Sequence, residues 1–159
     1  QWLDTGDGKQ PATYLIIPNT AIATKSSMTF IASAHSSESL NKDIVDIFNE
    51  LGVAMMVEEG LIPAGTSLAS CGIAYALRYI RAAMEGGVEL GFRADDAKRI
   101  VMQTLRGAVE ILEANSSHPE VEIDRVTTPG GLTIKGLNAM EASGFTNSVI
   151  EGLKASTKR

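Results

Sequence analysis

The sequence has 159 residues, 44% of them hydrophobic, and a formal net charge of −5 at pH 7, so it suffices for one domain or for one domain and part of a second. The negative charge excludes electrostatic attraction to nucleic acid or to an anionic membrane, and no apolar run reaches the roughly 18 residues of a membrane span. Cys71 is the single cysteine, which excludes an internal disulfide and favours a reducing compartment such as the cytoplasm.

Residues 1–60 carry the signals of three β-strands and one helix. Gln1–Asp4 lacks an initiator methionine and resembles the last turn of a helix, so we expect the chain to begin within a fold. Three short apolar runs, Tyr14–Ile17, Met28–Ser33 and Val53–Val57, predict strands that are buried on both faces of a covered sheet.

One helix is predicted between the second and third of these strands. Ser39 is its candidate N-cap, apolar side chains recur at helical spacing from Leu40 to Leu51, and Gly52 ends it. Strand, strand, helix, strand is half of an α/β sheet, and one helix leaves a face of that sheet uncovered.

From residue 62 onward every predicted element is a helix. One of them begins at Asp95 and Asp96, whose charge suits the first helical turn, and it is apolar across nearly half its circumference. Such a region often packs against a second copy of the chain. The predicted fold class is therefore mainly α, with a helical domain over residues 61–159 preceded by a partial α/β sheet segment over residues 1–60. The predicted helices cover residues 65–86, 95–114, a short acidic stretch after Pro119, 134–142 and 145–155.

The segment Val-Thr-Thr-Pro-Gly-Gly-Leu-Thr-Ile-Lys-Gly-Leu, ending at Leu137, is the strongest candidate for a binding site. Its two glycines let the backbone turn sharply and approach a small ligand. Thr133 begins an apolar helical run, where a helix offers unpaired N–H groups that suit a carboxylate. The alternative from the residues alone is a loop whose threonine caps the helix and whose glycines only make the bend.

This segment resembles the C-terminal signature of pyrroline-5-carboxylate reductase, the last enzyme of proline biosynthesis. Three further segments resemble that family in the same order: its Met-Pro-Asn-Thr-Pro segment, its acidic strand-to-helix junction and its Gly-Ser-Gly-Pro-Ala-Tyr helix start. They are Pro18–Thr20, Glu59–Ile62 and Cys71–Tyr75. The resemblance therefore runs over nearly the whole chain.

The resemblance implies a fold, an activity and an assembly. Residues 1–60 would be the C-terminal part of an NAD(P)-binding Rossmann domain, and residues 61–159 a helical dimerisation and substrate-binding domain. The helices would interleave in a homodimer or larger homo-oligomer, each active site being completed across the interface. The enzyme would reduce pyrroline-5-carboxylate to proline with NADP or NAD as cofactor. The chain has no Gly-x-Gly-x-x-Gly, so the pyrophosphate cradle would lie in an N-terminal half that is missing, and this fragment alone would be inactive.

The resemblance also implies roles for particular residues. Thr133 would be the catalytic residue, because its hydroxyl would contact the ring nitrogen of the substrate. Arg125 would meet the cofactor near the dimer interface, where an arginine can pair with phosphates, and Asn19 and Thr20 would border the nicotinamide. The substrate-binding residues would be Glu59, Thr128, Gly130, Gly131, Leu132 and Thr133.

Other readings of these residues stay open on the sequence. Glu59 beside Glu58 is typical of a solvated strand end, and Arg125 after Asp124 of a surface charge. Cys71 fits a small helix-packing residue. The two histidines, His35 and His118, have no ligand neighbours at metal spacing, so no metal site is expected.

The sequence departs from the family pattern at five positions, which leaves two alternative functions open. A different imine or β-hydroxyacid reductase of the same two-domain plan is one, and a non-catalytic helical dimerisation module is the other. NADP and NAD cannot be distinguished, because that choice lies outside this sequence. The departures are Cys71 for Ser, Ile73 for Pro, Ser70 for Gly, Ala21 for Pro, and Ser117 where an acidic residue is common.

Overall fold

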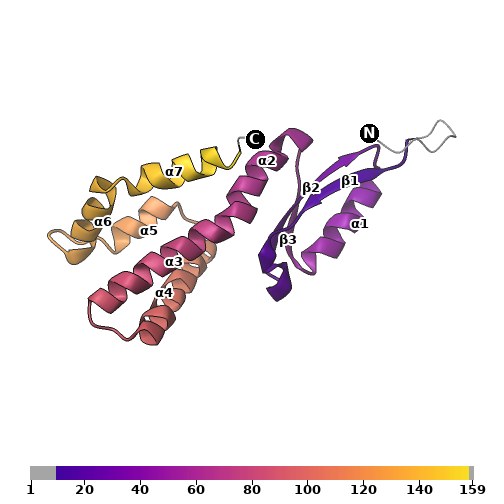
Figure 1. Ribbon diagram of the computed structural model, residues 1–159. Coiled ribbons are helices and arrows are strands. Elements are labelled where there is room, and N and C mark those ends of the chain that lie inside the picture. Colours follow the sequence, from indigo (N-terminus) through magenta and orange to yellow (C-terminus); the bar gives the residue numbers. More distant parts are fainter. Residues whose placement is uncertain (1–9, 158–159) are drawn as a thin grey trace. The chain divides into compact units, whose positions relative to one another are not determined.

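The computed structural model describes residues 10–157 (Figure 1). Contacts divide the chain into two compact units, one running to Tyr75 and including the chain from Gly152, the other being Ala76–Glu151. The domain boundary predicted at residue 60 stays a prediction. The helix end predicted at Gln1–Asp4 lies outside the described residues.

The first unit contains a three-stranded sheet in the order β1-β2-β3, formed by Thr13–Ile17, Ser27–Ala34 and Gly52–Met56. Strand β1 is antiparallel to β2, and β2 is parallel to β3. The central strand is the most buried, with Thr29 and Ile31 at 0% exposure. The three predicted strands are confirmed, with their ends moved by one residue. The expected burial on both faces was wrong for the outer strands, because Leu15 of β1 and Val53 and Met55 of β3 are exposed.

Helix α1, Glu38–Asn49, connects β2 to β3. Its N-cap is Ser37, whose Oγ accepts a hydrogen bond from Leu40 N at 3.3 Å, so the prediction of Ser39 as the cap was wrong. Serine is a favourable N-cap at either position, so the sequence alone does not distinguish Ser37 from Ser39. In the structure Ser37 has the extended backbone conformation of an N-cap residue, and Ser39 lies within the helix. Gly52 lies at the start of β3, with φ of 142°, instead of at the helix end.

One helix runs on from the sheet with an irregular turn inside it. The 3-10 turn η2, Glu59–Leu61, leads into α2, Ile62–Gly65, then a π-helical turn η3, Thr66–Cys71, and then α3, Gly72–Glu89. The helix predicted from residue 65 is confirmed, but Cys71 lies within it and not at its start. Gly65 lets α2 approach the sheet, because a Cβ there would come within 2.8 Å of the Phe30 ring.

Within the described residues, this helical run is the one helix that is long and apolar enough to resemble a membrane span. By length and composition alone Glu59–Glu89 could cross a membrane, contrary to the expectation that no stretch would. An apolar helix of a soluble protein has the same character, so this is weak evidence for a span.

The chain returns to the first unit at the end of α7, Phe145–Ala155. Ser67, 2% exposed, has its Oγ 2.7 Å from Leu153 O and 2.6 Å from Ser156 Oγ. The Tyr75 hydroxyl donates to Gly152 O at 3.2 Å. Hydroxyl groups of the first unit therefore bond carbonyls in the last turn of α7.

The second unit is helical, as predicted: the rest of α3, then α4, Ala94–Asn115, α5, Pro119–Arg125, α6, Leu132–Ala142, and α7 as far as Glu151. Among its described side chains Ala97 is the one buried hydrophobic residue, and a Cβ on Gly87 would lie 3.0 Å from it. Figure 1 shows the helices as rods joined by short turns. Large apolar side chains with at least 45% exposure remain on it: Leu77, Val88, Leu90, Phe92, Val109, Ile111, Val121, Val126, Leu132, Val149 and Ile150.

Candidate functional site

The Thr-Thr-Pro-Gly-Gly segment forms a tight turn between α5 and α6. Gly131 N donates to Thr128 O at 2.9 Å, and Gly130 has a φ of 70°. Pro129 and Gly130 occupy the two central positions, which is the residue pattern of a type II turn. A Cβ on Gly131 would lie 2.4 Å from Thr128 Oγ1. The predicted sharp bend is therefore confirmed. Gly130 is needed for its positive φ, and Gly131 because a side chain there would collide with Thr128.

Helix α6 begins directly after this turn without a side-chain cap. Gly131 is its N-cap residue, and Leu132 and Thr133 are its first two residues. Their N–H groups and that of Ile134 are first-turn donors, for which a helix has no internal acceptor. Thr133 is exposed, and its hydroxyl has no hydrogen-bond partner among the described residues. The alternative that Thr133 caps the helix is therefore wrong, and its hydroxyl remains available to a ligand.

The two threonines before the turn differ in their partners. Thr127 Oγ1 donates to Ile123 O at 2.7 Å, which fixes it to the last turn of α5. Thr128 is exposed, and within the described chain its hydroxyl has no hydrogen-bond partner. Thr128 and Thr133, but not Thr127, therefore present free hydroxyls beside the glycines.

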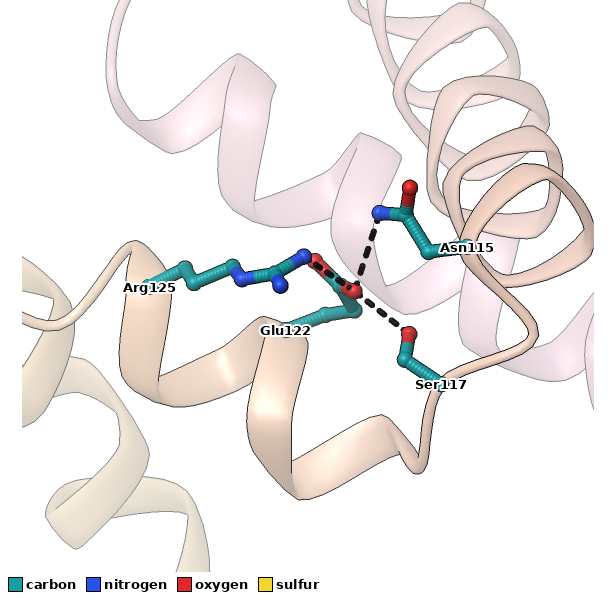
Figure 2. Close-up of polar contacts among 4 residues, drawn as sticks. All are labelled: Asn115, Ser117, Glu122 and Arg125. Carbon is teal, nitrogen blue, oxygen red and sulfur yellow. Dashed lines mark hydrogen bonds and ion pairs between the residues drawn. The ribbon is translucent and has the colours of Figure 1, made fainter.

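Arg125, at the end of α5, is held by Glu122 (Figure 2). Its NH1 donates to Glu122 Oε1 at 2.7 Å, and the same oxygen accepts from Asn115 Nδ2 at 3.0 Å and from Ser117 Oγ. The Arg125 side chain is 58% exposed and that of Glu122 16%. The guanidinium is thus tethered at one end and open to solvent at the other, where an anion can reach it.

Glu122 joins the end of α4 to α5 through these three hydrogen bonds. The bond from Ser117 is the main cause that holds the pKa of Glu122 below its ordinary value, against partial burial, which raises it. The sequence analysis missed Glu122, although a glutamate three residues before an arginine on a helix is a signal for an ion pair.

Asn19 lies at the carboxyl end of β1 and is buried, with 8% exposure. Its N–H donates to Ser27 Oγ at 3.2 Å, and its Oδ1 accepts from Ala21 N at 3.0 Å. Its Nδ2 lies 3.5 Å from Ala69 O. Thr20, the next residue, is exposed, and its hydroxyl bonds no described residue.

Glu59 is the first residue of η2 and is exposed. No ion pair or hydrogen bond engages its carboxylate within the part of the chain that the structure describes. Glu59 is therefore placed either to contact a ligand or to stay in solvent at the junction between strand and helix.

The candidate residues divide between the two units. Glu59, Asn19 and Thr20 belong to the first unit, while Arg125 and the segment from Thr128 to Thr133 belong to the second. Within the first unit the structure brings Asn19 against the π turn, and within the second it aligns the glycine turn with the start of α6. Across residues 10–157 no three His, Cys, Asp or Glu side chains gather as metal ligands, and His118 Nδ1 instead accepts from Glu120 N at 3.2 Å.

The sequence model of the family described as "Pyrroline-5-carboxylate reductase dimerisation" matches residues 59–159. The chain is 44% identical over 155 residues to pyrroline-5-carboxylate reductase 1 of Dictyostelium discoideum, covering 90% of this chain and 28% of that protein. It is 42% identical over 167 residues to pyrroline-5-carboxylate reductase 2 of the same organism, covering 94% of this chain and 56% of that protein.

Two solved structures share the fold. One is the pyrroline carboxylate reductase of Plasmodium falciparum with NADP bound, with a TM-score of 0.89 and 26% identity over 94% of this chain and 61% of that one. The other is the 1-pyrroline-5-carboxylate reductase of Streptococcus pyogenes, with a TM-score of 0.88 and 28% identity over 92% of this chain and 57% of that one. The chain thus spans less than two thirds of each of these relatives.

Proposed function

Because the chain belongs to the pyrroline-5-carboxylate reductase family through residues 59–159, we propose that the protein containing it reduces 1-pyrroline-5-carboxylate to L-proline with NAD(P)H. The similarity to two reductases of Dictyostelium discoideum supports the proposal. The structural observation that carries it is the uncapped start of α6 beside the free Thr133 hydroxyl.

The substrate has a carboxylate and a ring nitrogen close together on a five-membered ring. The unpaired N–H groups of Leu132, Thr133 and Ile134 can donate to that carboxylate, and the helix dipole favours a negative charge there. Thr133 Oγ can accept from the N–H of the protonated imine. Binding both groups at one helix start fixes the imine carbon in space, which is the main task of the protein in such a reaction.

The cofactor supplies the hydride to the imine carbon, and this chain can hold part of it. Thr20 offers an exposed hydroxyl beside the buried Asn19, and Arg125 offers a partly open cation for a phosphate. Taken separately, the loop at Thr20 in the first unit suits a nicotinamide, and Arg125 in the second unit suits a phosphate. The chain has no Gly-x-Gly-x-x-Gly, so the proposal assigns the pyrophosphate to residues outside this sequence. NADP is our first choice between NADP and NAD, since it is bound in the Plasmodium falciparum relative.

The proposed assembly is a homodimer or larger homo-oligomer in the cytoplasm. The dimerisation description of the family supports it, as do apolar side chains such as Leu90, 84% exposed, and Leu132, 86% exposed. Such uncovered surface is rare on a monomer and typical of one half of an interface. The cytoplasmic location rests on the single cysteine, Cys71.

The test uses the complete protein encoded by the gene that contains this sequence. We expect oxidation of NADPH, followed at its absorbance band, when pyrroline-5-carboxylate is added. An acyclic imine and a β-hydroxyacid with NADP⁺ serve as comparison substrates. Turnover of either without turnover of pyrroline-5-carboxylate would replace the proposal with another reductase of the same plan, and no turnover of any would leave a dimerisation module.

A further inference from the structure

We propose that Asn19 is a positioning residue that acts from inside the fold, and that buried Ser27 and Thr29 are what hold it. In this proposal the Thr20 hydroxyl and the backbone of the Pro18–Thr20 loop face the nicotinamide, while the Asn19 carboxamide does not. The inference rests on the proposed function, in which this loop borders the cofactor.

Each polar atom of Asn19 already has a partner within the chain. Besides the bonds to Ser27, Ala21 and Ala69, its carbonyl oxygen accepts from Ile22 N at 3.2 Å. With 8% exposure the side chain has little surface left for a ligand. An asparagine in this state serves as an N-cap and a brace for its own loop.

The backbone N–H of Asn19 contacts a pair of buried hydroxyl groups on β2. Ser27, 2% exposed, and Thr29, 0% exposed, lie two residues apart on the same face of the strand, with 3.0 Å between Ser27 Oγ and Thr29 Oγ1. Burying a hydroxyl without a partner is costly. One hydroxyl of the pair donates to the other, and Ser27 Oγ also accepts from the Asn19 N–H. An apolar residue at position 27 would therefore leave that buried N–H without an acceptor.

On its other side the loop is attached to the π turn η3. Ser70 Oγ donates to Pro18 O at 3.3 Å, and Ala69 O faces Asn19 Nδ2. Single π turns inside helices are frequent at functional sites. The loop is therefore held between β2 and η3 within one unit, and Thr20 is the side chain that it leaves free.

The experiment compares neighbouring serines in the complete protein. Ser27→Ala removes the acceptor of the Asn19 N–H, whereas Ser26→Ala removes only an exposed bond to Thr24 O at 3.3 Å. We expect kcat to fall by about tenfold in Ser27→Ala, because small displacements from the reactive geometry are costly, and to stay unchanged in Ser26→Ala. The KM for pyrroline-5-carboxylate should stay the same in both, since that substrate binds the glycine turn. A purely structural role would lower Tm and leave kcat of the folded protein unchanged.

Two further measurements complete the test. If Ser27→Ala does not fold, the near-isosteric Thr29→Val takes its place and should lower kcat by about threefold, by removing the partner that orients Ser27. Hydrogen exchange of the Asn19 backbone amide should be faster in Ser27→Ala, or in Thr29→Val if that replaces it, than in Ser26→Ala. This measurement does not depend on enzyme activity. An inactive parent protein with pyrroline-5-carboxylate would refute the proposed function. An active parent whose variants match Ser26→Ala in kcat and in exchange would refute this inference alone.

Discussion

Gly131 and Thr128 face each other across the turn before α6: the amide of Gly131 donates to the carbonyl of Thr128 at 2.9 Å, and no Cβ could fit beside Thr128 Oγ1. Gly131 therefore belongs both to the turn and to the N-terminus of α6, which has no side-chain cap. A change that opens the turn also moves the donors proposed to bind the substrate carboxylate.

Gly131→Ala should therefore raise the KM for pyrroline-5-carboxylate and lower Tm. The new Cβ would sit 2.4 Å from Thr128 Oγ1 and 3.0 Å from Thr128 O, and the backbone oxygen cannot rotate away. Steady-state kinetics and a thermal melt measure the two effects. Gly136→Ala on the same helix is the control, because nothing lies within 4 Å of a Cβ there. It should stabilise α6 by about 0.5–1 kcal/mol, and equal effects of the two changes would contradict the prediction.

Thr133→Ala should lower kcat/KM for pyrroline-5-carboxylate by about ten- to a hundredfold, as expected for loss of one hydrogen bond to a charged group. The dimer should stay intact, because the Thr133 hydroxyl has no partner among the described residues. Thr133→Ser, which keeps the hydroxyl, should restore most of the activity. Unchanged turnover in Thr133→Ala would remove Thr133 from the substrate site.

Stability should depend on pH through Glu122. Its pKa is lowered in the folded chain from an ordinary value of 4.5, mainly by the Ser117 hydrogen bond. The stabilisation is therefore fully present above pH 4.5 and is lost as the pH falls through the folded pKa. Urea midpoints of the parent and of Glu122→Gln should differ at pH 6, and the difference should shrink as the pH falls below 4.5.

Glu120→Gln is the matched control for that experiment, because it removes the same charge from the same helix, α5. Ser117→Ala should shrink the pH-dependent part of the Glu122 contribution. A constant difference between parent and Glu122→Gln across the whole pH range would show that the ionisation of Glu122 does not stabilise the fold.

Sedimentation at micromolar concentration should give a dimer or a larger assembly. The reason is the apolar surface of the second unit, where Ala97 is the one hydrophobic side chain described as buried. Dilution should lower the sedimentation coefficient only far below that concentration. A monomer at micromolar concentration would contradict the proposed assembly.

Much of the fold could be predicted from the sequence, because its signals are local. The apolar runs of the strands and the helical spacing after Asp95 each depend on neighbouring residues only, and the structure confirms them as β1, β2, β3 and α4. The Pro-Gly-Gly bend was predicted for the same reason. Gly130 has the positive φ that this turn requires, and few other residues adopt it.

The parts that could not be predicted depend on contacts between distant residues. The backbone N–H of Asn19 bonds Ser27, eight residues away, and its carboxamide lies against Ala69 O, fifty residues away, so no local pattern indicates that Asn19 is buried. The π turn at Thr66–Cys71 has no sequence signature comparable to a cap or a glycine. The sharing of one Glu122 oxygen by three donors depends on how α5 folds back on the end of α4.

The return of the chain at Gly152 has a practical consequence for dissecting this protein. The helical unit is an insertion with two crossing points, after Tyr75 and before Gly152, and Ser67 bonds the returning segment. A single truncation therefore cannot isolate either unit intact. An internal deletion that joins Tyr75 to Gly152 through a short linker would keep the serine contacts, and Ala76–Glu151 would be produced as a separate polypeptide.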